Sequence, residues 1–196
     1  MEEPVHRHFI IYKPFGYLSQ FIYRLKRNKR LLGDLFPFPD GTMAIGRLDE
    51  DSEGLLLLTT DGKVSELIRS RKIEKQYFAQ VDGLITTEAI AALQNGVEIG
   101  FKGTKYMTLP CEAYILRHDP GFAPRSQKIR DERHGPTSWV SITVTEGKFR
   151  QVRKMAAGVG FPVLRLIRVR VGNVHLGKMQ PGEVIEVADL INYCEM

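Results

Sequence analysis

The stretch from Gly46 to Gly62 reads GRLDEDSEGLLLLTTDG. It begins with a dense cluster of charged residues and continues into four leucines and two threonines, which end at the turn signal Asp61-Gly62. An apolar run of this length between turn residues is typical of a buried strand. Short loops held by a rigid strand are where proteins place reacting groups. Asp49 is therefore the first candidate functional residue.

Four interpretations of Asp49 compete. A calcium loop requires a bidentate Glu at its twelfth position, but the twelfth residue counted from Asp49 is Thr60, so we discount a metal site. Phosphate binding by glycines is also disfavoured, because neither GxxxxGK[ST] nor GxGxxG occurs. Two interpretations remain open. Asp49 is a turn or cap carboxylate, the ordinary role of a single Asp, or it is a catalytic carboxylate that works beside arginines on a polyanionic substrate.

The composition limits the class of protein. A chain of 196 residues suits one domain, or one domain of two fused halves. The two cysteines, Cys111 and Cys194, lie far apart and suggest neither a zinc site nor a disulfide framework. No run reaches membrane-spanning length, and the N-terminal MEEPVHRHFI is too polar and acidic for a signal peptide. We therefore expect a soluble cytoplasmic protein.

The distribution of charge indicates a polyanionic partner. The net charge is +5, and the range 147–182 contains no Asp or Glu. A stretch of one sign is the electrostatic footprint of a polyanion binder, although a solvated basic face remains an alternative. The segment 24–30, RLKRNKR, predicts an exposed basic loop with a possible RNA contact. The basic residues of 147–182 are Lys148, Arg150, Arg153, Lys154, Arg165, Arg168, Arg170 and Lys178.

Periodicity and turn signals predict the elements. Besides the leucine run, strands are expected over 8–12, 75–81, 97–99, 111–116, 139–145, 163–171 and 183–187, and helices over 64–70, 86–93 and 149–159. In the strand over 75–81, Tyr77, Ala79 and Val81 are expected on one face. Thr86 or Thr87 is expected to cap the helix over 86–93, and Asn95-Gly96 to end it. The range 118–136 reads as a long irregular connection that could be disordered without a partner. Many strands with short helices and no regular βαβ alternation indicate an α+β fold, with a mixed, largely antiparallel sheet flanked by short helices.

Four segments together resemble one family. The stretch 46–62 resembles the signature of the RsuA/RluA superfamily of pseudouridine synthases. Lys13-Pro14-Phe15-Gly16 resembles its KPxG motif, Lys75-Gln76-Tyr77 its K-x-Y motif, and the range 146–155, EGKFRQVRKM, its third motif. The chain is most similar to the RluE type, which acts on 23S ribosomal RNA. The resemblance implies a pseudouridine synthase fold and a single catalytic domain over residues 1–196, without the N-terminal S4 domain of many relatives.

The resemblance also implies roles for residues. Asp49 matches the catalytic carboxylate, Tyr77 the tyrosine that stacks on the flipped uracil, and Arg153 the arginine paired with the aspartate. Leu166, or alternatively Leu164, is expected to form the apolar wall opposite Tyr77.

Further expectations concern the RNA. Arg47 and Arg150 are expected to hold RNA phosphate or the space that the base vacates, and Lys13 to be structural or an RNA contact. Glu50, Asp51 and Glu53 are expected to be loop and solvent residues. The implied enzyme needs no cofactor and no metal, acts on 23S rRNA, and is expected to be a monomer. The alternatives are a synthase for tRNA or 16S rRNA, and an RNA-binding, ribosome-associated module that has lost catalysis.

Overall fold

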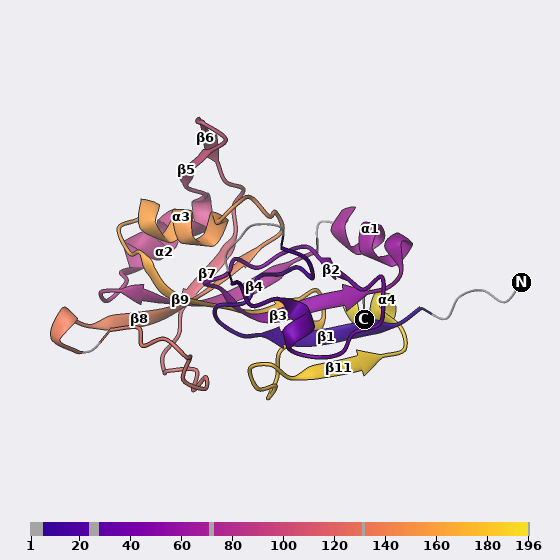
Figure 1. Cartoon of the computed structure of the whole chain (residues 1–196). Helices are drawn as coiled ribbons and strands as arrows, with labels where there is room; N and C mark the ends of the chain where they lie inside the picture. Colours follow the sequence, from indigo (N-terminus) through magenta and orange to yellow (C-terminus); the bar gives the residue numbers. More distant parts are fainter. Residues whose placement is uncertain (1–5, 24–27, 71–72, 131, 196) are drawn as a thin grey trace, which may run out of the picture. The chain divides into compact units, whose positions relative to one another are not determined.

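The computed structural model describes residues 6–23, 28–70, 73–130 and 132–195 (Figure 1). The chain forms two compact units: unit 1 comprises Met1–Ile73 and Arg168–Met196, and unit 2 comprises Glu74–Ile167. The described residues combine antiparallel strand pairs with short helices in both units. The predicted α+β class is therefore confirmed.

Unit 1 is built around strands β1 and β3. Strand β1 pairs antiparallel with β3 on one side and with β11 on the other, and β2 also pairs with β3. The predicted strands over 8–12, the leucine run and 183–187 are confirmed, whereas β2 and α4 were not predicted. The elements are β1 (His8–Lys13), η1 (Leu32–Asp34), β2 (Met43–Ile45), β3 (Glu53–Thr59), α1 (Gly62–Ser70), β10 (Val174–His175), β11 (Val184–Val187) and α4 (Leu190–Glu195).

The sequences of β1 and β3 explain their central place. All six residues of HFIIYK and all seven of EGLLLLT are buried. Strands covered on both faces read as continuous apolar runs rather than as alternating ones. On β1, the ring of Phe9 packs against Phe36 and Phe38, with centroids 6.1 and 5.2 Å away. The extended segment after η1 therefore closes over the strand.

Gly54, the second residue of β3, lies very close to the backbone of Arg168. A Cβ atom at Gly54 would stand 2.3 Å from the carbonyl oxygen of Arg168 and 2.8 Å from its nitrogen. Its φ is +102°, a conformation that side chains disfavour. The Arg168 guanidinium, which is buried, donates from Nε to the carbonyl oxygen of Leu55 at 2.7 Å. Only glycine fits at position 54.

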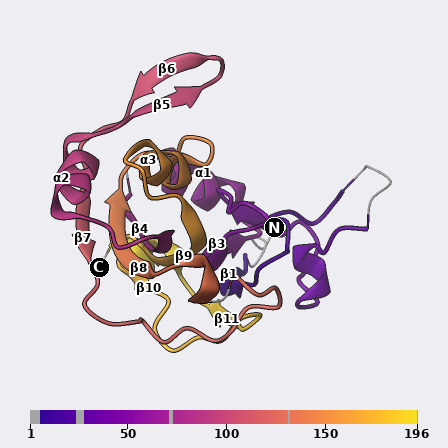
Figure 2. The same cartoon turned by 90° about the vertical axis from the view of Figure 1, so that its left-hand side faces the viewer.

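Unit 2 contains a sheet and a separate hairpin. Strand β8 pairs antiparallel with both β4 and β7, while β5 and β6 form a separate two-stranded antiparallel sheet (Figure 2). The hairpin stands away from the strands of the sheet in Figures 1 and 2. Strand β6 was not predicted, and β5 is longer than expected. The elements are β4 (Lys75–Asp82), α2 (Thr87–Asn95), β5 (Glu98–Phe101), β6 (Thr104–Met107), β7 (Glu112–Ile115), η2 (Glu132–His134), β8 (Thr137–Val144) and α3 (Gln151–Gly158), with β9 (Val163–Val171) crossing into unit 1.

One apolar core joins these elements. Ala79 from β4, Ile142 from β8, Leu93 from α2 and Met155 from α3 are all buried in it. Thr86 caps α2, because its side chain accepts from the Ala89 N–H, and Gly96 ends the helix. Both ends of α2 follow the predicted capping pattern.

The connection over 118–136 has little regular structure, as predicted, but it is anchored rather than loose. Arg130 forms an ion pair with Asp82. The Arg165 Nη2 donates to the carbonyl oxygen of Ala123 at 2.8 Å, and the ring of Phe122 lies 5.9 Å from that of Trp139. These contacts hold the connection against the strands of unit 2.

We predict that Gly54→Ala lowers the free energy of unfolding by more than about 2 kcal/mol, because the new Cβ meets backbone atoms and the positive φ is strained. Gly62→Ala is the matched control, since a Cβ there has nothing within 4 Å, and it should change stability by less than about 0.5 kcal/mol. Urea denaturation of both variants measures the difference. Equal stability of the two variants would contradict the role of Gly54.

Candidate functional site

The loop that carries Asp49 is fixed through its main chain. The backbone N–H of Leu48 donates to the Ser19 hydroxyl at 2.9 Å, and that hydroxyl donates to the carbonyl oxygen of Leu48 at 2.7 Å. On the other side, the Gly16 N–H donates to the carbonyl oxygen of Glu50 at 2.8 Å, and the Ser52 N–H donates to that of Asp49 at 3.1 Å. The segment after β1 therefore holds the chain on both sides of Asp49.

The side chains of this loop divide into exposed and buried groups. Arg47 is exposed, whereas Asp49 is half-buried. Lys29, the next-to-last residue of the predicted basic loop, forms an ion pair of 2.8 Å with Glu50. Lys29 thereby links the described end of the basic run to the loop that carries Asp49, and residues 24–27 lie outside the described residues.

Lys13 and Glu53 are interior residues. Lys13 is fully buried, and its Nζ donates to the carbonyl oxygens of Pro14 and Tyr17 at 3.0 and 2.7 Å. Burial lowers the pKa of Lys13 to about 8, against an opposing attraction from nearby carboxylates, of which Glu53 is the strongest. Of the two expected roles of Lys13, its burial favours the structural one. The expectation that Glu53 is a solvent residue is wrong, because it is buried at the start of β3 beside this ammonium group.

Tyr77 lies on the central part of β4. It is half-buried against the core of unit 2, and it stands opposite Ile142 of β8 in the antiparallel register. Its neighbour Gln76 faces the other side of the sheet, where its amide donates to the Ser141 hydroxyl at 2.9 Å. The predicted alternation along β4 therefore holds, and packing keeps Tyr77 on the core side.

Arg150 and Arg153 belong to the start of helix α3. Arg150 occupies the N-cap with φ +53° and ψ +34°, a left-handed conformation that is uncommon for a residue other than glycine. Its carbonyl accepts from the Lys154 N–H at 3.0 Å. Arg153 is half-buried, and its Nη1 donates to the carbonyl oxygen of Val163 at 3.5 Å. The helix begins two residues later than predicted because Arg150 turns the chain.

Glu146 organises the turn before α3, which the sequence analysis did not anticipate. Its carboxylate accepts from the Tyr106 hydroxyl at 2.7 Å, from the Leu109 N–H at 2.9 Å and from the Gln151 amide at 2.6 Å. The side-chain oxygen Oε1 of Gln151 in turn accepts from the backbone N–H of Lys148 at 2.9 Å. Glu146 and Gln151 both lie in the segment EGKFRQVRKM. Their position in this motif was the sequence signal that could have indicated their role.

Leu166 and two arginines of the basic range 147–182 prove to be internal. Leu166 is 5% exposed and belongs to the core of unit 2, whereas Leu164 is half-buried. Arg165 and Arg168 are also buried and donate to backbone carbonyls. The interpretation of 147–182 as one exposed basic footprint is therefore wrong for these two arginines. The other basic residues of that range are exposed or half-buried.

The chemistry of other candidate groups is limited. Cys111 and Cys194 are free thiols, and burial raises the pKa of each to about 11, so a thiolate is scarce near neutral pH. Among the described residues, no group of three or more His, Cys, Asp and Glu side chains is placed to hold a metal ion. In the same described part of the chain, no helix is long and apolar enough to cross a membrane.

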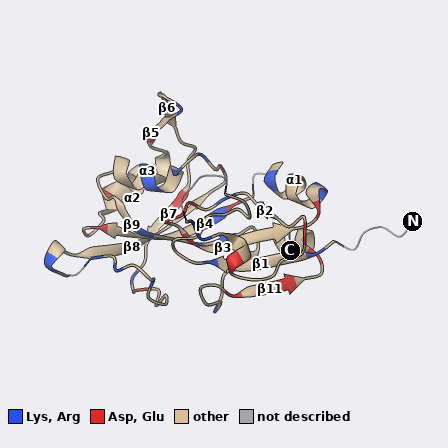
Figure 3. Cartoon of the chain, in the orientation of Figure 1, with Lys and Arg blue, Asp and Glu red and all other residues tan. Residues whose placement is uncertain are grey.

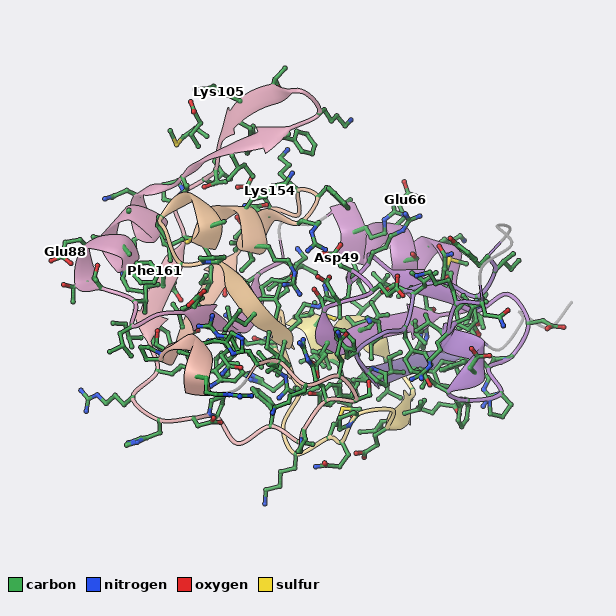
Figure 4. The ribbon with its side chains drawn as sticks, turned by 60° about the vertical axis from the view of Figure 1, so that its left-hand side comes forward. Asp49, Glu66, Glu88, Lys105, Lys154 and Phe161 are labelled. Carbon is green, nitrogen blue, oxygen red and sulfur yellow. The ribbon has the colours of Figure 1, made fainter. Side chains whose placement is uncertain are left out.

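The predicted residues divide between the units. Unit 1 contains Arg47 and Asp49, and unit 2 contains Tyr77, Arg150, Arg153 and Leu166. Unit 1 thus contributes a half-buried carboxylate on a fixed loop, and unit 2 contributes a half-buried aromatic ring and two cations at a helix start. Figure 4 shows Asp49 on its loop. Within unit 1, a carboxylate on a fixed loop suits nucleophilic or base chemistry. Within unit 2, an aromatic ring and guanidinium groups suit stacking on a base and contacts with an anion.

Comparison with known proteins identifies relatives that match most of the chain. Residues 7–158 match the family model for RNA pseudouridylate synthase. The chain is 40% identical to "Ribosomal large subunit pseudouridine synthase E" of Xanthomonas campestris over 176 residues, which cover 89% of this chain and 91% of that protein. The protein of the same name from Vibrio parahaemolyticus is 39% identical, with coverage of 91% and 72%. A crystal structure of a pseudouridylate synthase superposes with a TM-score of 0.73 at 28% identity, covering 95% of this chain and 71% of that one.

We predict that stability rises with pH because of Lys13. The folded protein releases the Lys13 proton near pH 8 and the unfolded chain near 10.5, so the unfolded chain binds more protons between these values and folding becomes more favourable as pH increases. From pH 7 to 9 this contribution should reach about 1.4 kcal/mol. It is measured as the change in unfolding free energy that Lys13→Met removes. Exposed Lys63→Met should leave the pH dependence intact, and an unaltered slope in Lys13→Met would contradict the prediction.

Proposed function

Because the chain belongs to the RNA pseudouridylate synthase family, we propose that it isomerises a specific uridine of 23S ribosomal RNA to pseudouridine in the cytoplasm, acting as a monomer. The observation that carries the proposal is the similarity to ribosomal large subunit synthases over nine-tenths of the chain. The Asp49 loop supports it, because its main chain is held on both sides of the carboxylate.

In the proposed reaction, the bond between N1 and C1′ breaks, the uracil turns, and a bond between C5 and C1′ forms. The C5 hydrogen leaves as a proton and N1 gains one, so atoms and electrons balance without an oxidant or a transferred group. Asp49 is the proposed catalytic carboxylate. It acts as a nucleophile or as a base at the sugar, since a carboxylate can serve in either way without leaving the enzyme.

Tyr77 and Arg153 are the proposed partners of the target nucleotide. A paired uridine must leave its stack at a cost of a few kcal/mol, and stacking on the Tyr77 ring would return about 1–3 kcal/mol. A guanidinium at Arg153 would favour the ionised form of the catalytic carboxylate. Arg150 supports the same view of this region, because strained left-handed residues cluster at functional sites.

Three further residues complete the proposal. Arg47, which is exposed, and Arg150 would contact RNA phosphates or the space that the base leaves. Leu166 would form the apolar wall of the uracil pocket. Leu166 is buried in the core of unit 2, so it would support the pocket by packing behind it. Leu164, which is half-buried, is the alternative residue for the wall.

Asp49→Asn should reduce pseudouridine formation at least about 1,000-fold, because an amide is neither nucleophile nor base. The measurement is tritium release from C5-tritiated uridine in a 23S rRNA fragment. RNA affinity, measured by fluorescence anisotropy, should stay within about threefold of the wild type, since the substitution is isosteric. Asp51→Asn is the matched control, with the same change two residues along, and it should keep most activity. Full activity in Asp49→Asn would refute the assignment, and an inactive wild type would favour an RNA-binding module.

A strain that lacks the gene should lose one pseudouridine from its 23S rRNA, because a positioned base pocket selects a single site. Mapping pseudouridines across all stable RNAs tests this. The plasmid-borne wild type should restore the modification, and the Asp49→Asn variant should not. Loss from 16S rRNA or tRNA instead would overturn the choice of substrate while leaving the chemistry in place.

A further inference from the structure

The β5–β6 hairpin ends in a turn that a lysine occupies at a conformational cost. The two central residues, Lys102 and Gly103, have φ of +50° and +78°, and they join the paired residues Phe101 and Thr104. Two-residue turns with positive φ at both positions strongly prefer Asn-Gly, Asp-Gly or Gly-Gly. Lys102 therefore adopts an unfavourable backbone conformation at the first position of the turn. Residues held in such conformations cluster at functional sites, which suggests a function for the Lys102 side chain.

The hairpin is tied to the start of α3 rather than mobile by itself. The Glu146 carboxylate bonds the hairpin residue Tyr106 and the α3 residue Gln151. The Lys154 ammonium, on α3, donates to the Gly100 carbonyl oxygen at 2.7 Å. The hairpin and α3 thus present one continuous face within unit 2, on which Figure 4 labels Lys105 and Lys154.

This face combines cations with aromatic rings. We define the hairpin surface as Lys102, Lys105, Lys148, Phe149 and Lys154. The Lys148 ammonium lies 4.7 Å from the ring centroid of Tyr106 and 5.3 Å from that of Phe101. Lys102 lies 5.6 Å from Phe101, and Lys154 lies 5.4 Å from Phe149, whose side chain is 67% exposed.

The charge of the hairpin surface is one-sided. The ranges 97–107 and 146–158 contain six Lys and Arg residues and two acidic residues, Glu98 and Glu146. Glu98 forms an exposed ion pair of 2.8 Å with Lys105, which is worth little in solvent. Figure 3 shows the basic residues at the hairpin and on α3. Such a patch attracts a polyanion, and an exposed aromatic ring among cations adds a platform on which bases stack.

We propose that the hairpin surface is a second RNA-binding site, which grips a segment of the substrate RNA flanking the target uridine. The proposal rests on the proposed function, because the RNA is that of the synthase. Lys102, Lys105 and Lys148 contact phosphates, and Phe149 stacks on an unpaired base. The Glu146 network couples this grip to the turn that carries Arg150, so binding of the flank and placement of Arg150 share one scaffold.

The decisive variant is Lys102→Asn with Lys105→Gln. Asparagine suits the left-handed position, so the midpoint of thermal unfolding should not fall. The KM for a 23S rRNA fragment should rise about fivefold to thirtyfold with kcat unchanged. The slope of log affinity against log salt should become shallower by about 1.4 to 1.8, the effect of two lost phosphate contacts. A second variant, Phe149→Ala, should raise KM, and Phe149→Trp should restore it.

The control removes the same charge elsewhere. Lys63→Gln with Arg69→Gln takes two cations from exposed positions of α1, and it should leave the salt slope within about 0.5 of the wild type because neither side chain contacts RNA in this proposal. Wild-type KM and salt slope in the hairpin variant would overturn the proposal while tritium release still supported the synthase. An effect seen only on ribosomal particles, and not on naked RNA, would instead assign the surface to a protein partner and would also overturn it.

Discussion

The close approach of the Gly54 and Arg168 backbones is the constraint on which unit 1 depends. Lys13 lies opposite Gly54 in the register of β1 and β3, so three segments that are far apart in sequence meet at one residue without a side chain. The buried Lys13 ammonium and the buried Glu53 carboxylate flank this point. Because a buried charge needs nearby partners, the attraction between Lys13 and Glu53 offsets part of the cost of burying both beside this contact.

In the Asp49 loop, hydrogen bonds fix the main chain on both sides of the proposed reacting group. Ser19 and Gly16 hold the main chain at Leu48 and Glu50, one on each side of Asp49. Rigid elements position functional groups better than loops do, and here the loop takes its rigidity from the segment after β1. The KPxG-like motif therefore contributes to the site through the backbone that it sets.

Two basic residues with a left-handed backbone conformation mark a second region of interest, in unit 2. Among the described residues, two residues other than glycine have clearly positive φ, and they are Lys102 and Arg150. Both lie in unit 2, and the Glu146 hydrogen bonds join their two segments. Strain of this kind persists where the surrounding structure holds it and where the side chain has a use. The Glu146 hydrogen bonds hold these two segments in place. In the proposal, the side chains of Lys102 and Arg150 bind an RNA substrate.

The sequence by itself determined the elements whose signals are local. The leucine run, the capped helix α2 and the alternation along β4 are all confirmed, because continuous or periodic apolar patterns and cap residues act over a few neighbours. The motif order was equally readable, so the family and the candidate residues Asp49, Tyr77 and Arg153 could be named. What only the tertiary structure decided were non-local facts: the burial of Lys13, Glu53, Arg165 and Arg168, and the pairing of β6 with β5. Burial of a charge and formation of a hairpin depend on partners that local pattern does not encode, which is why both escaped sequence reasoning.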